Sequence, residues 1–330
     1  MATRERLIST REPDAWREAL LNLPHAYWHT WEACMAAHVG SGLPTWLYEY
    51  KDNNGNRAVC PFSERRFRDS VDIFTPSGFS GFSAVGDIAM LREHWRNFVA
   101  AQSYICGYFA LHPKLAITSM HQNLVATNEL FVKGLGCKDD TALAEVDRGV
   151  RRSVREWESS KSHYVTDRKA LSGFLLANYR PFMTAIQANP AAMWSDEGLE
   201  IMCQDPAVLM VGAEDEQGIC AVYAFAVTAF GAECHLNISV RAGRQFTTPL
   251  LWWGIRTLTD QEIPWINLGG GVTRNDAVAT AKLKYRPDVF LLQTAREIYN
   301  EQTYQASCAA VSVDASAHEG FFPRYHQRHL

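Results

Sequence analysis

The sequence predicts a mixed α/β fold in two domains, and three observations support this. The chain has 330 residues, 47% of them hydrophobic, which is more than a single domain usually contains. Strand-like apolar runs alternate with helix-like segments, an order that gives a mixed sheet with helices on its faces. A polar stretch at 151–169 interrupts this order. We therefore expect one domain at 1–150 and a second at 151–304, with the tail at 305–330 packed back on the first.

Composition limits the classes of function. The formal net charge is -4, so no overall positive field favours nucleic acid, and a polyanion would have to meet a local basic stripe. The charged N-terminal segment lacks the apolar core of a signal peptide, and no apolar run approaches the roughly 18 residues of a membrane span. The scattered cysteines form no C-x-x-C pair and are interpreted as reduced thiols. We expect a cytoplasmic, monomeric chain that does not bind membranes.

Two segments predict β-hairpins of the same design. Segment 45–62 has two apolar runs around a polar tip at Asn54-Gly55, and segment 208–230 repeats this arrangement around Gly218. The two tips lie about half the chain apart. Either the similarity is chance, or one mixed α/β unit is used twice.

The second half alternates strands and helices around a glycine turn. Thr248 is expected to cap a helix whose first residue is Pro249. In chain order we expect a strand, a loop, a helix, a strand, the glycine turn, a short helix and a final strand or helix, at 235–240, 241–248, 249–261, 264–268, 269–271, 275–286 and 288–299.

The glycine turn consists of three consecutive glycines, which cost conformational entropy and therefore indicate a need for bare backbone. A dinucleotide fingerprint fails because Arg274 stands where G-x-G-x-x-G requires its third glycine, and no Walker loop is present. The turn is therefore either structural close packing or the lining of a substrate site.

Two further motifs offer weak chemistry. In "SGFSG" at 77–81 a glycine follows Ser80 at once, which is not the G-x-S-x-G elbow of a serine hydrolase. With Thr75 before it, this loop more plausibly brings backbone amides close to a ligand. His25 and His29 have the spacing of two zinc ligands on one helix face, but no third ligand accompanies them. No metal site is expected.

Four arginines lie at helical spacing on one face, at Arg148, Arg151, Arg152 and Arg155. They form either a solvated face paired with neighbouring acids or a contact to a phosphate backbone.

Several segments, taken in order, resemble the FemABX family, whose members have tandem acetyltransferase-like (GNAT) domains and form peptide bonds with aminoacyl-tRNA. "DIFTPSGFSGF" resembles the family's T-P-x-G-x-x-G loop, and "YFALHPKL" resembles its strand ending in Asp-Pro or His-Pro. "RGVRRSVREWESS" resembles the R-x-x-x-R helix that enters the second domain. "CHLNISV", "TPLLWWGIRTL" and "INLGGG…AKLKY" resemble that domain's strand, helix and L-G-G-G…F-K-x-x-F signature. The resemblance covers roughly residues 20 to 300 and implies an α/β fold of two tandem GNAT domains with mixed sheets.

The resemblance also implies a reaction centre. Lys282 matches the lysine of F-K-x-x-F, with Ala281 and Tyr285 at the aromatic positions. A preorganised ammonium there would stabilise the negative charge that builds up when an amine attacks an ester carbonyl, the alternative being a solvent-exposed lysine. His112 matches the acid of the family's Asp-Pro and would be the base that takes the acceptor's proton, or else a core histidine.

The expected binding residues come from the same matches. The substrate-binding set is Thr75, Ser77, Gly78, Phe79, His235, Asn237, Gly269, Gly270, Gly271, Arg274 and Tyr285. The phosphates of tRNA would meet Arg148, Arg151, Arg152 and Arg155.

Departures from the family pattern bear on the acceptor. The helix "WEACMAAH" lacks the lysine with which the family's cell-wall members hold a nucleotide diphosphate, and Ala185 stands at the place of their arginine. A small amine, such as an intermediate of a peptide-like metabolite in antibiotic or cell-wall biosynthesis, fits better than a nucleotide-linked peptidoglycan precursor.

The donor is inferred from the loop "RAGRQFTT", which lacks the R/Q-x-x-G-x-G/A pattern that holds the pyrophosphate of coenzyme A. We expect aminoacyl-tRNA as co-substrate and no other cofactor. The alternatives are an acyl-CoA-dependent N-acyltransferase, a UDP-muropeptide aminoacyltransferase, and a binding protein without catalysis.

Overall fold

The computed structural model describes residues 4–136, 141–188, 193–317 and 320–329. Its contacts divide the chain into two compact units, one formed by Met1–Thr127 with Leu292–Leu330 and the other by Asn128–Leu291. This division differs from the predicted boundary at 150/151. The chain leaves the first unit within strand β7 (Leu124–Gly134) and returns to it within β13 (Asp288–Ile298), so the boundaries fall inside strands rather than in the polar stretch.

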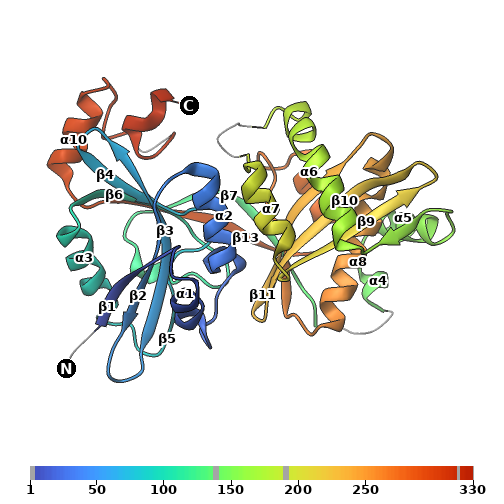
Figure 1. The fold of residues 1–330 in the computed structure, drawn as a ribbon, viewed down its shortest axis with the longest axis horizontal. Helices are drawn as coiled ribbons and strands as arrows, with labels where there is room; N and C mark the ends of the chain where they lie inside the picture. The colour runs from blue at the N-terminus through green and yellow to red at the C-terminus, as the bar shows by residue number, and fades with distance from the viewer. Residues whose placement is uncertain (1–3, 137–140, 189–192, 318–319, 330) are drawn as a thin grey trace. The chain divides into compact units, whose positions relative to one another are not determined.

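The first unit contains a mixed sheet in the order β1-β2-β3-β4-β6-β13, with β5 paired to β3 (Figure 1). Neighbouring strands are antiparallel except for the parallel pair β4–β6. The strands are β1 (Arg4–Ser9), β2 (Thr45–Lys51), β3 (Arg57–Phe67), β4 (Ser70–Phe74), β5 (Ser83–Val85) and β6 (Tyr104–Ala110), followed by β13. The helices are α1 (Pro13–Leu20), α2 (Trp31–Ser41), α3 (Leu91–Ala101) and α10 (Glu301–Ala309), with short 3-10 helices at Tyr27–His29, Thr118–Met120 and Arg324–His329.

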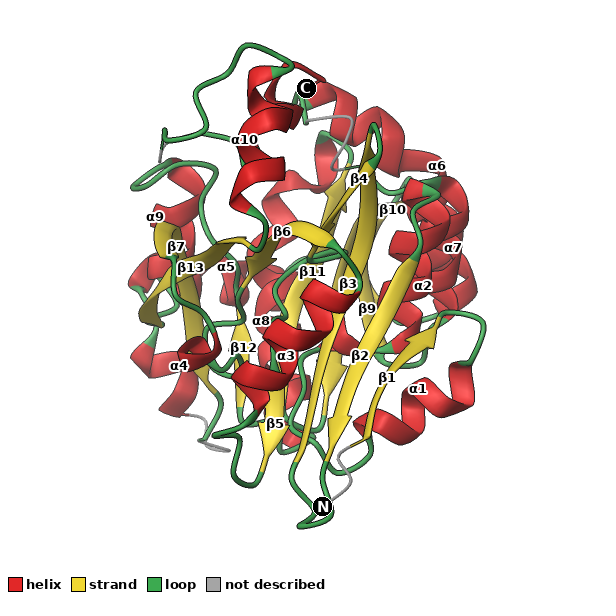
Figure 2. Cartoon of the chain, turned by 90° about the vertical axis from the view of Figure 1, so that its left-hand side faces the viewer, coloured by secondary structure: helices red, strands yellow, loops and turns green. Residues whose placement is uncertain are grey.

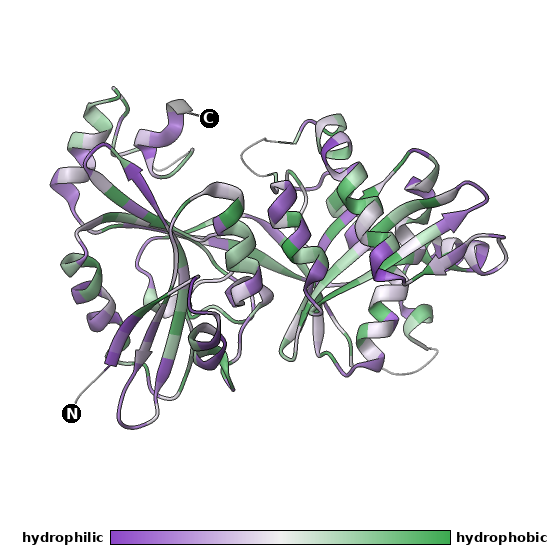
Figure 3. Cartoon of the chain, in the orientation of Figure 1, coloured by the Kyte–Doolittle hydropathy of each residue, from purple (hydrophilic) through white to green (hydrophobic). Residues whose placement is uncertain are grey.

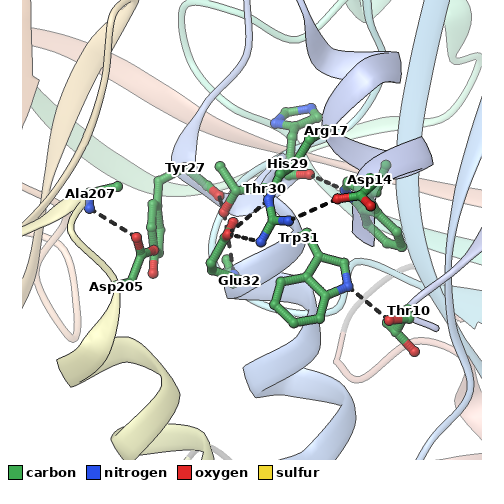
Figure 4. A network of polar contacts seen from close by, with 12 residues as sticks. Thr10, Asp14, Arg17, Tyr27, His29, Thr30, Trp31, Glu32, Asp205 and Ala207 are labelled. Carbon is green, nitrogen blue, oxygen red and sulfur yellow. Dashed lines mark hydrogen bonds and ion pairs between the residues drawn. The ribbon is translucent and has the colours of Figure 1, made fainter. Parts of the chain in front are cut away.

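Helices cover both faces of this sheet, α3 on one side and α1 with α2 on the other (Figure 2). Successive residues of β2 point to opposite faces: Tyr48 packs with Trp95 of α3, whereas Leu47 packs with Trp16 of α1. An ion pair joins α1 to the first turn of α2, where the Arg17 guanidinium lies 2.8 Å from the Glu32 carboxylate (Figure 4).

The C-terminal segment packs on the first unit. The side chain of Tyr325 is fully buried, and its hydroxyl donates to the Asp72 carboxylate at 2.9 Å. Asp72 is itself completely buried and accepts a hydrogen bond from Arg65 at 2.7 Å. A buried carboxylate requires such partners, so the tail completes the polar interior of this unit.

The second unit contains a mixed sheet in the order β7-β12-β11-β10-β9-β8. Its remaining strands are β8 (His163–Val165), β9 (Val208–Asp215), β10 (Gly218–Thr228), β11 (Gly231–Ser239) and β12 (Trp265–Asn267). Its helices are α4 (Thr141–Glu145), α5 (Arg148–Glu158), α6 (Arg168–Ala185), α7 (Asp196–Gln204), α8 (Thr247–Asp260) and α9 (Ala277–Leu283), with a 3-10 helix at Ala242–Phe246. Apolar residues concentrate on the central strands, as Figure 3 shows for β9 and β10.

Close packing places α6 and α8 on opposite faces of the second sheet. Leu171 of α6 lies against Gly212, where a Cβ would come within 2.5 Å of it. On the other face the ring of Phe225 occupies the space above Gly254 of α8, at 2.1 Å from the position of a Cβ. Helix α8 begins at Thr247 with Phe246 as its N-cap residue, slightly before the predicted start.

The two units share one strand plan, which settles the question of the repeated hairpins. The tips at Gly55 and Gly218 both have positive φ, +85° and +111°, and connect β2 to β3 and β9 to β10. Each sheet has one parallel pair, β4–β6 in the first unit and β11–β12 in the second. Beyond this pair, each sheet ends in a strand from the segments that connect the units, β13 next to β6 and β7 next to β12.

No helix among the described residues is long and apolar enough to cross a membrane. The seven described cysteines are all free thiols, and Cys137 lies outside the described residues.

Replacement of Tyr325 tests the anchoring of the tail. Tyr325→Ala should lower the free energy of unfolding by about 3–5 kcal/mol, because it removes a fully buried aromatic ring. Tyr325→Phe keeps the ring and removes one hydrogen bond to a charged group, so about 1.5–3 kcal/mol is expected. Urea unfolding of both variants measures this. A Tyr325→Ala protein as stable as the parent would contradict the anchoring.

Candidate active site

The parallel strands β11 and β12 separate after a short pairing. Only Ala232↔Ile266 and Glu233↔Asn267 are paired, whereas β11 continues along β10 to Ser239. The chain after β12 instead stays with β7, because the Leu268 amide donates to Phe131 O at 2.7 Å and the Phe131 amide donates to Gly269 O at 3.1 Å. We call this divergence the strand separation; it leaves part of β11 without a neighbour on that side.

The equivalent position in the first unit is closed. The Thr75 amide donates to Tyr108 O at 2.9 Å, and the Thr75 hydroxyl accepts from the Ala110 amide at 3.0 Å. Further along, the Ser80 amide donates to Ala110 O. The loop after β4 is thereby hydrogen-bonded to β6. The first unit therefore has no strand separation at the place where the second unit has one.

The glycine turn follows β12, and each of its three carbonyls accepts a hydrogen bond. Gly269 O accepts from Phe131, Gly270 O from Lys282 Nζ at 2.6 Å, and Gly271 O from the Asn128 side chain at 2.9 Å.

The space around each glycine explains the tripled residue. Gly269 has φ +76°, a conformation that side chains disfavour. A Cβ at Gly270 would lie 2.5 Å from Glu129 O, and one at Gly271 would lie 2.5 Å from Thr273 O. The turn is therefore close packing that also supplies the acceptor for the lysine.

Asp276, which the sequence interpretation missed, holds the turn to α9. Its carboxylate accepts from the amides of Val272, Thr273 and Ala279, at 2.6, 3.0 and 2.7 Å. It is the N-cap of α9, and its N-terminal position favours an acid. The sequence signal for this cap is an aspartate three residues before Ala279, whose amide it accepts.

Lys282 lies on α9 with its ammonium between the turn and β11. The side chain is half-buried, and burial lowers the pKa of its ammonium below that of an ordinary lysine. It is close enough to the Cys234 thiol of β11 for the two groups to interact electrostatically. One hydrogen of the Lys282 ammonium is donated to Gly270 O, and an ammonium has two more hydrogens to donate.

A β-bulge at His235 changes which residues of β11 share a face. Ala224 pairs with Leu236 and Phe225 with Cys234, so His235 is the extra residue of the bulge. Asn237 reaches Thr247 at the start of α8, whereas His235 contacts Met202 of α7. The family resemblance assigned both residues to substrate binding; the structure directs them to different helices.

The amide of Asn237 lies on the same side of the sheet as Cys234. Its Oδ1 is buried, and no hydrogen-bond partner for it occurs among the described residues. Asn267, at the end of β12, likewise has an unmatched buried Nδ2 within that part of the chain, although its Oδ1 accepts from the Gly269 amide. Buried polar groups of this kind are usually matched by a ligand or water.

The other predicted binding residues of the second unit differ in role. Tyr285 is buried, and its hydroxyl lies 3.4 Å from Thr248 O, so it joins α9 to α8. Arg274 is exposed in the loop before α9.

His112 is oriented by its own backbone. It is almost completely buried, and its Nδ1 accepts the amides of Lys114 and Leu115 at 3.2 and 3.1 Å. The ring proton must then lie on Nε2, which can donate but not accept. Burial lowers the pKa of His112 to about 3. This geometry favours a neutral structural histidine over a general base.

The predicted binding loop of the first unit is also tightly packed. Gly78 has φ +56°, and a Cβ there would lie 2.1 Å from the ring of Trp28. Thr75 is buried and bonded to β6, while Ser77 and Phe79 are half-buried. His112 and this loop belong to the first unit, whereas Lys282 belongs to the second.

The arginine stripe on α5 is only partly available. Arg151 donates to Ala144 O and Val146 O, both at 2.7 Å, and so closes the preceding turn. Arg152 lies 3.5 Å from Glu156. Arg148 and Arg155 are exposed and have no ion pair among the described residues.

The described residues contain no cluster of metal-binding side chains. His29 is buried, and its Nε2 contacts Gly81 O at 3.0 Å, a bond within the fold. In the loop before α8, a Cβ at Gly243 would lie 2.0 Å from Cys220 O, so this glycine serves packing against β10.

This arrangement, two sheets of one strand plan with a strand separation and a lysine in the second, defines a tandem GNAT-like fold. No protein-family model and no curated protein sequence matches the chain. Among solved structures, it is similar to FemX, with 10% identity, a TM-score of 0.66, and coverage of 92% of this chain and 99% of that chain.

Two further solved structures are also similar. The C-terminal domain of an inferred lysylphosphatidylglycerol synthetase from Agrobacterium fabrum has 13% identity and a TM-score of 0.60, covering 94% of this chain and 100% of that chain. L-PGS from Bacillus licheniformis has 11% identity and a TM-score of 0.58, covering 88% and 92%. The chain therefore has a FemX-like fold.

The buried histidines predict acid lability. Burial lowers the pKa of His29 and His112 to about 3 and that of His235 to about 4, below the usual 6.5. The unfolded chain therefore binds these protons first as the pH falls. Stability should be full above about pH 6.5, and each histidine should lower it by up to about 1.4 kcal/mol per pH unit from there down to its folded pKa.

His112→Asn separates a structural role from a basic one. The Asn Oδ1 can replace Nδ1 as acceptor for the backbone amides, so the variant should fold, keep most activity and lose one histidine's share of the acid dependence. Urea unfolding from pH 7 to pH 4 measures the pH dependence of stability, and kcat of the variant measures the retained activity. A loss of more than about 100-fold in kcat without loss of stability would instead identify a general base.

Proposed function

We propose that this protein is an aminoacyl-tRNA-dependent transferase that forms an amide bond on the amine of a small peptide-like acceptor. The observation that carries the proposal is Lys282: a half-buried ammonium held by Gly270 O at the strand separation, with hydrogens left to donate. The similarity of the fold to FemX and to lysylphosphatidylglycerol synthetases supports a group transfer of this class.

The chemistry requires no covalent enzyme intermediate. The acceptor nitrogen attacks the ester carbonyl carbon, a C–N bond forms, and the bond to the ribose oxygen breaks. The proton lost by the amine balances the one gained by that oxygen. The carbonyl oxygen becomes negative in between, and the Lys282 ammonium would stabilise it there more than in the ground state.

The electrostatics of α2 argue for an acceptor without a diphosphate. The first turn of this helix has Glu32 rather than a cation, and Arg17 is bound to that carboxylate at 2.8 Å. A nucleotide diphosphate would meet no unpaired cation on this turn. A neutral or cationic amine fits this surface better.

The packing of Gly243 favours aminoacyl-tRNA over acyl-CoA. Pyrophosphate binding at a helix N-terminus uses free amides in a glycine-rich loop. Here the Gly243 amide donates to Val240 O at 3.0 Å, and its Cα is pressed against β10. Acyl-CoA is the second candidate donor, because the loop still leads directly into α8.

Label transfer distinguishes the donors. Purified protein is incubated with a mixture of charged tRNAs or, separately, with labelled acyl-CoAs, and with cell extract as the source of acceptor. We expect ribonuclease-sensitive transfer from tRNA to a small product. Transfer from acyl-CoA alone would contradict tRNA dependence and support the second donor.

Lys282→Met should lower kcat by about 100- to 1,000-fold, the usual cost of losing one oxyanion donor. Lys284→Met is the matched control, because Lys284 is an exposed lysine two residues further on. KM should change little in both variants, whereas thermal stability should be unchanged in Lys284→Met and modestly lower in Lys282→Met, which leaves Gly270 O without its donor. Equal activity of the two variants would remove Lys282 from the reaction.

The pH profile reports the same ammonium. Because burial lowers the pKa of Lys282, activity that depends on its charge should decline on the alkaline side below the usual lysine value of about 10.4. Lys282→Arg keeps a charge at all accessible pH values, so its residual activity should lack this decline. An unchanged alkaline limb in the arginine variant would assign the limb to another group.

A further inference from the structure

A cavity of ≈490 Å³ lies in the second unit, between the C-terminal half of α5, the segment leading into β8, and α8. Neither Lys282 nor any other residue of the candidate active site lines it. Its size suits a small organic molecule, and its lining is of an unusual kind.

Aromatic rings form one wall of this cavity. Trp157 of α5 and Tyr164 of β8 have ring centroids 4.7 Å apart, tilted by 39°. Trp253 of α8 follows at 6.3 Å from Tyr164. Tyr164 and Trp253 are only half-buried, so part of their surface remains accessible. Ring faces carry partial negative charge and attract cations.

Charged groups at the rim complement a positive ligand. Glu158 and Asp260 both line the cavity, are exposed, and form no ion pair within the described part of the chain. Arg256 is the one guanidinium of the lining, and His163 is paired with the Glu214 carboxylate at 2.8 Å. Two carboxylates against one guanidinium leave the rim negative.

Both charge types reach the aromatic wall. Burial and the Glu158 carboxylate raise the pKa of the Tyr164 hydroxyl to about 12, while Arg256 opposes this. The carboxylate and the guanidinium therefore flank the same ring, with the remaining carboxylate one helical turn from Arg256 on α8.

We propose that this cavity is a second ligand site, which binds a small organic cation with its ammonium against the accessible rings of Tyr164 and Trp253, behind which Trp157 is buried. Glu158 and Asp260 supply the countercharge at the rim. A ligand that also carries a carboxylate gains a contact with Arg256. The negative rim disfavours phosphates, so a nucleotide is not the expected occupant. This site does not depend on the proposed transferase function.

Choline and its neutral isostere 3,3-dimethylbutan-1-ol test the proposal directly, because they differ in charge but not in shape. Binding to the full chain is measured by ligand-observed NMR and by tryptophan fluorescence at constant ionic strength. Choline should bind at least about 10-fold more tightly than the alcohol. Equal binding of the two, or no saturable binding of choline, would overturn the proposal.

Variants locate the binding. Trp253→Leu should weaken choline about 10-fold or more, since it removes an accessible ring while keeping an apolar side chain. Glu158→Gln should weaken it several-fold, whereas Glu156→Gln, on the same helix but outside the lining, should not. Thermal unfolding verifies the fold of each variant. Equal effects of the two glutamate variants would place the bound choline elsewhere and overturn the assignment.

Discussion

The geometry of the second unit depends on how three consecutive glycine carbonyls are satisfied. Gly269 O is bound to β7, Gly271 O to Asn128, and Gly270 O to the ammonium of Lys282. Any side chain at Gly270 or Gly271 would collide with backbone, so the turn can exist only with bare glycine. The lysine is thus positioned by the same packing that ends β12. The bond to Gly270 O holds the Lys282 side chain in one orientation.

The two units show how one strand plan can serve different purposes. In the first, hydrogen bonds from the loop after β4 to Tyr108 and Ala110 close the place where the parallel strands would part. In the second, β12 follows β7 instead, and β11 loses its neighbour after Glu233. The segment that follows the first strand or the second strand of the parallel pair therefore determines whether a unit has the strand separation. In the first unit the loop after β4 bonds to β6, and in the second the chain after β12 bonds to β7. The first unit therefore has a closed sheet, whereas the second keeps the strand separation beside the glycine turn and Lys282.

Sequence patterns predicted what local chemistry controls. The hairpins at Gly55 and Gly218, the glycine turn and the short helix with Lys282 all follow from turn propensity and periodicity. The places of β7 and β13 could not be predicted. β7 pairs with β12 and β13 pairs with β6, and pairing between strands so far apart in the chain does not change the residue pattern of either strand. The bulge at His235 was also missed, since one extra residue reverses the alternation without changing composition. For His112 the family match left a base and a core histidine open, because the two backbone amides that fix its tautomer cannot be predicted from residue type.

The partial burial of Lys282 sets opposing demands on its chemistry. Removal from water strengthens the interaction of its charge with a developing oxyanion, yet the same desolvation lowers the pKa and favours the neutral amine. The bond to Gly270 O counteracts this loss, because a carbonyl oxygen stabilises the protonated form. Asp276, close enough to interact with the ammonium, acts in the same direction while its carboxylate is engaged by three amides. The turn and Asp276 therefore oppose the proton loss that burial favours, and a lysine on an exposed helix face would experience neither the burial nor these contacts.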